Sequence, residues 1–184
     1  MIKKIALAAT IIALSSSLQA EGYSEGKKFI GIEGGGAQLQ GGRYMDLEDP
    51  LSFDPMYKGK GPIGGLRFGA QNEKYRTMIL FDYYSNDDDD QTYQMGLISI
   101  DYYVLSQDAA AVTIKPFIGI NFGYMRYEST LVDEDDFVYG GQAGMVMSVS
   151  DKVDIDLTYR YNLSYEAPTM DHLGALLLGV NYLY

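Results

Sequence analysis

The sequence predicts an all-β protein: an eight-stranded antiparallel up-and-down β-barrel that crosses a membrane. Three observations lead to this fold class. Runs in which apolar and polar residues alternate recur eight times along the chain, as expected for strands with one apolar face. The last thirteen residues, HLGALLLGVNYLY, form such a run and end on an aromatic residue. Every second connection between the runs is rich in acidic residues, and the turns between are short.

The first twenty residues have the pattern of a secretory signal peptide. Lys3 and Lys4 supply the charged start, Ile5 to Leu14 an apolar core, and Ala20 the small residue before the expected cleavage site. The apolar core is too short to span a bilayer comfortably, which argues against a membrane anchor. We therefore expect residues 1–20 to be removed, residues 21–27 to form a short periplasmic segment, and residues 28–184 to form the barrel.

Composition excludes several classes of function. The chain has no cysteine, so disulfides, thiol chemistry and cysteine metal sites are absent. Loss of the two lysines of the signal peptide takes the formal net charge from −11 to −13, which argues against a nucleic-acid partner. Gly34–Gly36 and Gly140–Gly141 lack the Gly-Lys-Ser/Thr and helix of a phosphate loop, and no cofactor is predicted.

The eight runs each have one apolar parity. They cover residues 28–40, 61–71, 75–85, 92–105, 111–127, 137–149, 152–163 and 172–184. In chain order the apolar face is carried by Ile30 and Ile32, Leu66 and Phe68, Ile79 and Phe81, Ile98 and Ile100, Ile118 and Ile120, Met145 and Met147, Ile155 and Leu157, and Leu176 and Leu178. A soluble sandwich gives the same alternation, so parity alone leaves open which face lies inside.

The polar face indicates that the charges lie inside the barrel. Its acids and bases nearly balance, as buried charges must, because an unpaired buried charge costs several kcal/mol. We predict an interior ionic network made of Glu33, Arg67, Asp82, Asp101, Lys115, Asp156 and Arg160. Side chains just fill an eight-stranded barrel, so we expect the network to be structural, with a narrow pore for small solutes or ions as the alternative.

The acidic connections are expected at about 41–60, 86–91, 128–136 and 164–171, and hold fifteen of the 25 acidic residues. If the chain starts in the periplasm, these connections lie outside the cell. Their weak candidates for a metal site are Asp87, Asp88, Asp89, Asp90, Asp133, Asp135 and Asp136. The spacing of an EF-hand is absent, so divalent cations shared with lipopolysaccharide phosphates are the looser expectation. Arg126, of outward parity, either contacts such phosphates or extends to the interface without a specific partner.

Tyrosines gather at the ends of the predicted strands. Seventeen are present, and rings at both edges of an apolar belt are typical of membrane proteins. We expect interfacial girdles from Tyr83, Tyr84, Tyr102, Tyr103, Tyr124, Tyr127, Tyr159, Tyr161, Tyr182 and Tyr184.

With these features, residues 27–184 resemble the small eight-stranded outer-membrane barrels of Gram-negative bacteria, typified by the transmembrane domain of outer-membrane protein A. Gly179, Tyr182 and Tyr184 match the terminal assembly signal of that family, although Leu177 replaces its usual polar residue. The resemblance implies an outer-membrane location, contact with lipid and lipopolysaccharide, and recognition by the barrel-assembly machinery. The periplasmic domain of that family is not expected.

We expect no enzymatic activity, because the residues for catalysis do not fit a known pattern. The chain has one histidine, His172, with Asp171 and Ser164 near it in sequence. Some barrels of this kind are lipid-A deacylases with a serine two residues from the histidine, but Gly174 stands there. The leading hypothesis is a non-enzymatic barrel that supports envelope integrity. The alternatives are a narrow pore, a lipid-A-modifying enzyme and a soluble lipocalin-like barrel, which usually has a tryptophan that this chain lacks.

Overall fold

The computed structural model describes residues 26–45, 53–86, 91–105, 107–109, 112–128, 133–165 and 171–184. The expected signal peptide therefore lies outside the described residues. The strands are β1 (Lys27–Met45), β2 (Phe53–Gln71), β3 (Tyr75–Asn86), β4 (Gln91–Tyr103), β5 (Gln107–Ala109), β6 (Val112–Glu128), β7 (Asp133–Ser150), β8 (Val153–Ser164) and β9 (His172–Leu183). Within these ranges, no helix is long and apolar enough to cross a membrane.

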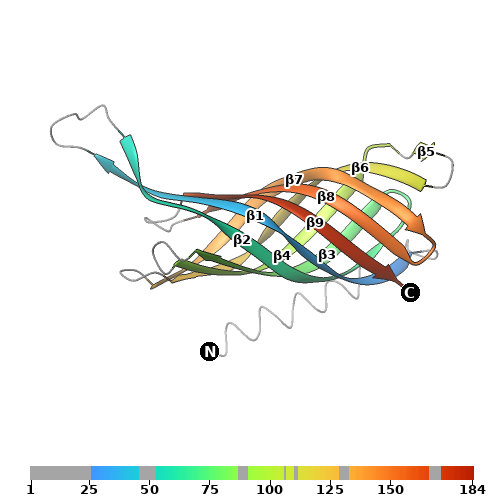
Figure 1. Cartoon of the computed structure of the whole chain (residues 1–184), viewed down its shortest axis with the longest axis horizontal. Coiled ribbons are helices and arrows are strands. Elements are labelled where there is room, and N and C mark those ends of the chain that lie inside the picture. The colour runs from blue at the N-terminus through green and yellow to red at the C-terminus, as the bar shows by residue number, and fades with distance from the viewer. Residues whose placement is uncertain are drawn as a thin grey trace.

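The strands form one closed antiparallel sheet (Figure 1). Each long strand pairs with the next long strand in sequence, and pairing of β9 with β1 closes the seam between the two ends of the chain. β5 is a three-residue strand that pairs only with β6, at the barrel end where the chain terminates. The barrel wall is therefore built from eight strands, which confirms the predicted up-and-down topology.

The barrel is apolar outside and polar inside. Ile32, Ile120 and Leu178 point outward and are 61%, 61% and 57% exposed, whereas Arg67 and Asp101 point inward and are fully buried. Strand alternation places successive side chains on opposite faces, so the two parities of each run separate cleanly. An apolar outer face is what a barrel surrounded by lipid requires, and the arrangement confirms the transmembrane fold class.

Two of the predicted loops are largely strand. β1 continues to Met45 and β2 starts at Phe53, so most of the expected connection 41–60 is a paired ribbon that projects beyond the rest of the barrel (Figure 1). Likewise, β7 begins at Asp133, inside the connection expected at 128–136. The prediction was wrong here because it followed the apolar parity, which ends where the lipid ends. Backbone ladder pairing does not depend on an apolar face and continues further.

The predicted tyrosine girdles are only partly correct. Tyr83, Tyr102 and Tyr124 point outward and are 42–50% exposed. Tyr84, Tyr103 and Tyr127 instead point into the barrel and are 0–4% exposed. Residues an odd number of positions apart in a strand face opposite sides of the sheet, so one member of each of these pairs, Tyr83 and Tyr84, Tyr102 and Tyr103, and Tyr124 and Tyr127, is directed inward.

Candidate functional site

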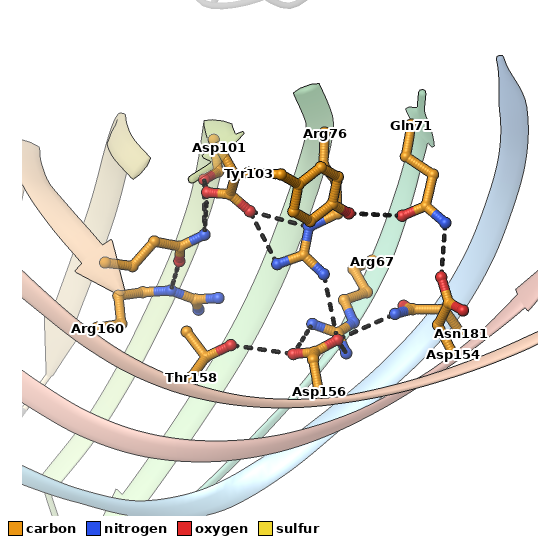
Figure 2. A network of polar contacts seen from close by, with 12 residues as sticks. Arg67, Gln71, Arg76, Asp101, Tyr103, Asp154, Asp156, Thr158, Arg160 and Asn181 are labelled. Atoms are coloured by element: carbon orange, nitrogen blue, oxygen red, sulfur yellow. Dashed lines mark hydrogen bonds and ion pairs between the residues drawn. The ribbon is translucent and has the colours of Figure 1, made fainter. Parts of the chain in front are cut away.

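The candidate site is a continuous network of buried polar side chains inside the barrel (Figure 2). Arg67 of β2 lies within it. Its Nη1 donates to Oε2 of Glu33 at 3.2 Å, and its Nη2 donates to Oδ2 of Asp156 at 2.7 Å. All three side chains are at most 1% exposed, so each charge depends on the others for solvation.

Asp156 of β8 joins a second arginine to the first. Nη1 of Arg76 lies 3.2 Å from Oδ2 of Asp156, and Nε of Arg76 donates to Oδ2 of Asp101 at 2.9 Å. Asp156 also accepts hydrogen bonds from the Thr158 hydroxyl at 2.9 Å and the Asn181 amide at 3.0 Å. One carboxylate thus receives donors from several strands of the barrel.

Arg160 of β8 binds the remaining carboxylates. Its Nη1 lies 2.7 Å from Oε1 of Glu33 and 2.5 Å from Oδ2 of Asp82. Its Nε donates to the side-chain Oε1 of Gln142 at 2.9 Å, and the side-chain Nε2 of Gln142 donates to Asp101 at 2.7 Å. The three arginines are therefore connected through shared carboxylates and one amide, and no described arginine inside the barrel stands alone.

Toward the end of the barrel that holds the chain terminus, neutral groups extend the network. The Tyr103 hydroxyl donates to the Gln71 carbonyl oxygen at 2.8 Å, and the Gln71 amide donates to Asp154 at 2.5 Å (Figure 2). Arg76 also lies over the Phe117 ring, with Cζ 4.6 Å from the centroid, which adds a cation–π contact.

Six of the seven residues predicted for the interior network lie together, and Lys115 does not. Lys115 is half-buried near the start of β6, and its Nζ lies 5.4 Å from the centroid of the Tyr103 ring. Within the described part of the chain it forms no ion pair. Arg76, which was not in the predicted network, instead supplies a third buried arginine. The polar parity of Arg76 and Asp154 was a signal in the sequence, but parity does not distinguish the middle of a strand from its end.

Inward-facing glycines make room for the network. A Cβ at Gly179 would collide with the guanidinium of Arg67, and one at Gly65 would collide with the carboxylate of Asp82. Large interior side chains thus require bare backbone on nearby strands: Asp82 is paired with Gly65 across β2 and β3, and β1 alone separates Arg67 from Gly179. The glycine predicted as part of the assembly signal thus also has a place in the packing, while Tyr182 and Tyr184 point outward, 49% and 70% exposed.

Toward the other end, the interior is largely apolar, with buried amides of Asn86 and Gln91 beside the Tyr84 hydroxyl. It is filled by fully buried side chains, among them Leu39 of β1, Leu97 of β4 and Met125 of β6. Tyr84, Tyr93 and Tyr127 join this cluster. The described part of the interior is therefore packed with an ionic network, an apolar cluster and a few buried amides.

Several of the predicted metal candidates lie outside the described residues. Asp87–Asp90 are among these, and β7 begins at Asp133; alternation along that strand places the side chains of Asp135 and Asp136 on opposite faces. Asp136 accepts a hydrogen bond from the Ser164 hydroxyl and one from the Phe137 N–H at 2.7 Å. Among the described residues, no group of three or more His, Cys, Asp or Glu side chains is placed to hold a metal ion.

The residues considered for catalysis and for lipid contact each interact with a different partner. The Ser164 hydroxyl contacts Asp136, whereas Nδ1 of His172 lies 3.5 Å from Oδ2 of Asp171 and its ring stacks on Tyr161 at 5.0 Å. Arg126 forms an exposed ion pair with Glu128 at 2.6 Å.

Comparison with known proteins identifies the fold. No family model matches the sequence, and a comparison with curated proteins found no match. Among solved structures, Neisserial surface protein A is 20% identical, with a TM-score of 0.65 over 85% of this chain and 97% of that one. Outer membrane protein H (OprH) from P. aeruginosa is 18% identical, with a TM-score of 0.56 over 86% and 99%.

A third similar structure is the N-terminal β-barrel domain of Pseudomonas aeruginosa OprF, which is 10% identical with a TM-score of 0.54 over 87% of this chain and 100% of that domain. At these identities the likeness concerns the fold, and it agrees with the eight-stranded wall and the inverted distribution of apolar and polar residues. The chain therefore has the fold of the small eight-stranded outer-membrane β-barrels.

Proposed function

We propose that this protein is a closed, non-enzymatic barrel of the bacterial outer membrane that supports envelope integrity and displays acidic connections at the cell surface. The observation that carries the proposal is the filled interior. Arg67, Arg76 and Arg160 are at most 1% exposed, and each is held by carboxylates from other strands. Such a lumen favours a structural role over conduction, because opening a pore requires these ion pairs to separate.

The proposed orientation follows from the two ends of the barrel. The short turns 72–74 and 151–152 lie at the end that carries both the start of β1 and the end of β9, and short turns are typical of the periplasmic side. The long β1–β2 ribbon and the acidic connections then face outward. The pattern of residues 1–20 supports export, and Gly179, Tyr182 and Tyr184 supply the signal proposed for recognition by the barrel-assembly machinery.

Partners follow from this placement. The apolar outer wall contacts membrane lipid, and the acidic connections share divalent cations with lipopolysaccharide phosphates. His172, with its ring stacked on Tyr161 and Gly174 two residues on, has no role in this proposal beyond packing.

Three measurements test the proposal. The protein from the outer-membrane fraction should migrate faster on gels when unheated, because a closed barrel resists detergent. In planar bilayers it should show no stable openings. Release by osmotic shock with unchanged mobility would overturn the membrane location, and stable conductance would replace the closed barrel with the pore. Lipid A acylation should be the same with wild-type protein and with His172→Ala; a difference would indicate an enzyme.

A further inference from the structure

A groove of about 540 Å³ lies on the outer wall of the barrel, over strands β8, β9, β1 and β2. Its floor includes Gly36 and Gly174. The rings of Tyr159 and Tyr161 form one side, and Lys60 and His172 lie at its upper part, nearest the long connections.

The strand register defines two rows of outward residues across this groove. The upper row runs from β8 to β2 through Tyr161, Gly174, Gln38 and Lys60, and the lower row runs through Tyr159, Leu176, Gly36 and Pro62. The upper row is polar with one cation, and the lower row is apolar. The groove thus changes from polar to apolar in the direction expected on entering a bilayer from its surface.

The packing of the protein does not account for the bare backbone at Gly36, whereas a Cβ at Gly174 would lie 3.2 Å from the Tyr159 hydroxyl. A Cβ built at Gly36 meets no atom within 4 Å, and those at Gly34 and Gly64 make only ordinary contacts, at 3.7 Å and 3.5 Å. Glycine in a strand lowers stability relative to alanine, and lipid-facing positions favour apolar side chains. Bare backbone at such positions often marks close approach of another molecule.

The charge of the groove favours an anionic occupant. Lys60 is exposed, and no carboxylate of the described residues forms an ion pair with it. Nδ1 of His172 lies 3.5 Å from Oδ2 of Asp171, and the His172 ring stacks on Tyr161. The positive charge of the groove comes from Lys60. An ammonium at one side of the groove, aromatic rings at the other and an apolar floor between them suit a phosphate with an acyl chain below it.

We propose that this groove binds one lipopolysaccharide molecule, with a lipid A phosphate beside Lys60 and an acyl chain over Gly36 and Leu176. The inference rests on the proposed function, because that orientation places the groove in the outer leaflet. A second copy of the chain fits less well. Two copies inserted in the same direction and related by a two-fold axis along the groove would bring Lys60 opposite Lys60, and like charges across an interface are unfavourable.

The test is native mass spectrometry of the purified protein in micelles of a neutral detergent, titrated with short-chain lipopolysaccharide or with phosphatidylglycerol. We expect one lipopolysaccharide per barrel and at least tenfold weaker binding by Lys60→Glu and by Gly36→Leu. Lys28→Glu reverses an exposed lysine at the opposite end of β1, and Gly96→Leu fills an outward glycine on β4 whose Cβ meets only the Phe81 ring, at 3.7 Å; both should bind as wild type.

Four outcomes would overturn the proposal: no binding by wild type, equal losses in the test and control variants, equally tight phosphatidylglycerol binding, or a protein dimer with empty grooves. The unheated gel mobility of each variant is measured in parallel. If all variants migrate as closed barrels from the outer-membrane fraction but the affinities do not differ, the groove fails and the proposed function stands. If wild type itself is not found in the outer membrane, the proposed function fails.

Discussion

The side chains in the two halves of the barrel interior are held together by different interactions. One half, around Arg67 and Asp156, is an ionic network whose members satisfy one another's charges. The other half, around Leu97 and Met125, is an apolar cluster. Loss of a group from the apolar half leaves a cavity, whereas loss from the ionic half leaves an unpaired charge with no water to solvate it. The ionic half should therefore be the less tolerant of truncation.

The largest expected effect comes from Arg67→Met. It removes the guanidinium that contacts Glu33 and Asp156 and leaves both carboxylates undercompensated, at a cost of about 3–5 kcal/mol in the free energy of unfolding. Urea unfolding in lipid vesicles measures it. Arg126→Met, which breaks the exposed pair with Glu128, is the matched control and should cost at most about 1 kcal/mol. Equal losses in the two variants would contradict the distinction between interior and surface pairs.

In the apolar half, Leu97→Ala should cost about 3 kcal/mol. Leu97 is 1% exposed, so truncation loses its burial and leaves a cavity among packed neighbours. Measured under the same urea conditions, the loss should fall below that of Arg67→Met. The reverse order would show that the ionic network relaxes more easily than the apolar cluster.

Within the ionic half, Glu33→Gln should destabilise the barrel more than Asp82→Asn. Glu33 forms ion pairs with both Arg67 and Arg160, whereas Asp82 forms an ion pair with Arg160 and a hydrogen bond with Glu33. We expect about 2 kcal/mol for Glu33→Gln and about half of that for Asp82→Asn. The double variant tests coupling through Arg160, and strictly additive losses would exclude it.

The smallest effect is expected for Lys115→Gln, which should change the free energy of unfolding by no more than about 0.5 kcal/mol. Lys115 is half-buried and approaches the Tyr103 ring without joining the described ion pairs. A loss comparable to that of Arg67→Met would place Lys115 in the network after all.

Local pattern predicted the wall of the barrel because a strand has a period of two and the membrane requires one apolar face. The same parity placed Glu33, Asp82 and Arg160 inside. It did not identify which charges meet, because contacts across the lumen depend on strand register and tilt, which no local pattern contains. For this reason the predicted network left out Arg76 and included Lys115. Tyr84, next to Tyr83, was assigned to the surface because it lies near a strand end, although its parity directed it inward.

The contact between Gly179 and Arg67 also bears on how the barrel closes. In the register of the seam, Gly179 of β9 lies between Glu33 of β1 and Asp156 of β8, the two carboxylates that bind Arg67. A shift by one residue would put a leucine or a valine where that guanidinium needs open backbone and would turn polar side chains toward lipid. Arg67 of β2 thus disfavours shifted registers of β9, a strand with which β2 does not pair.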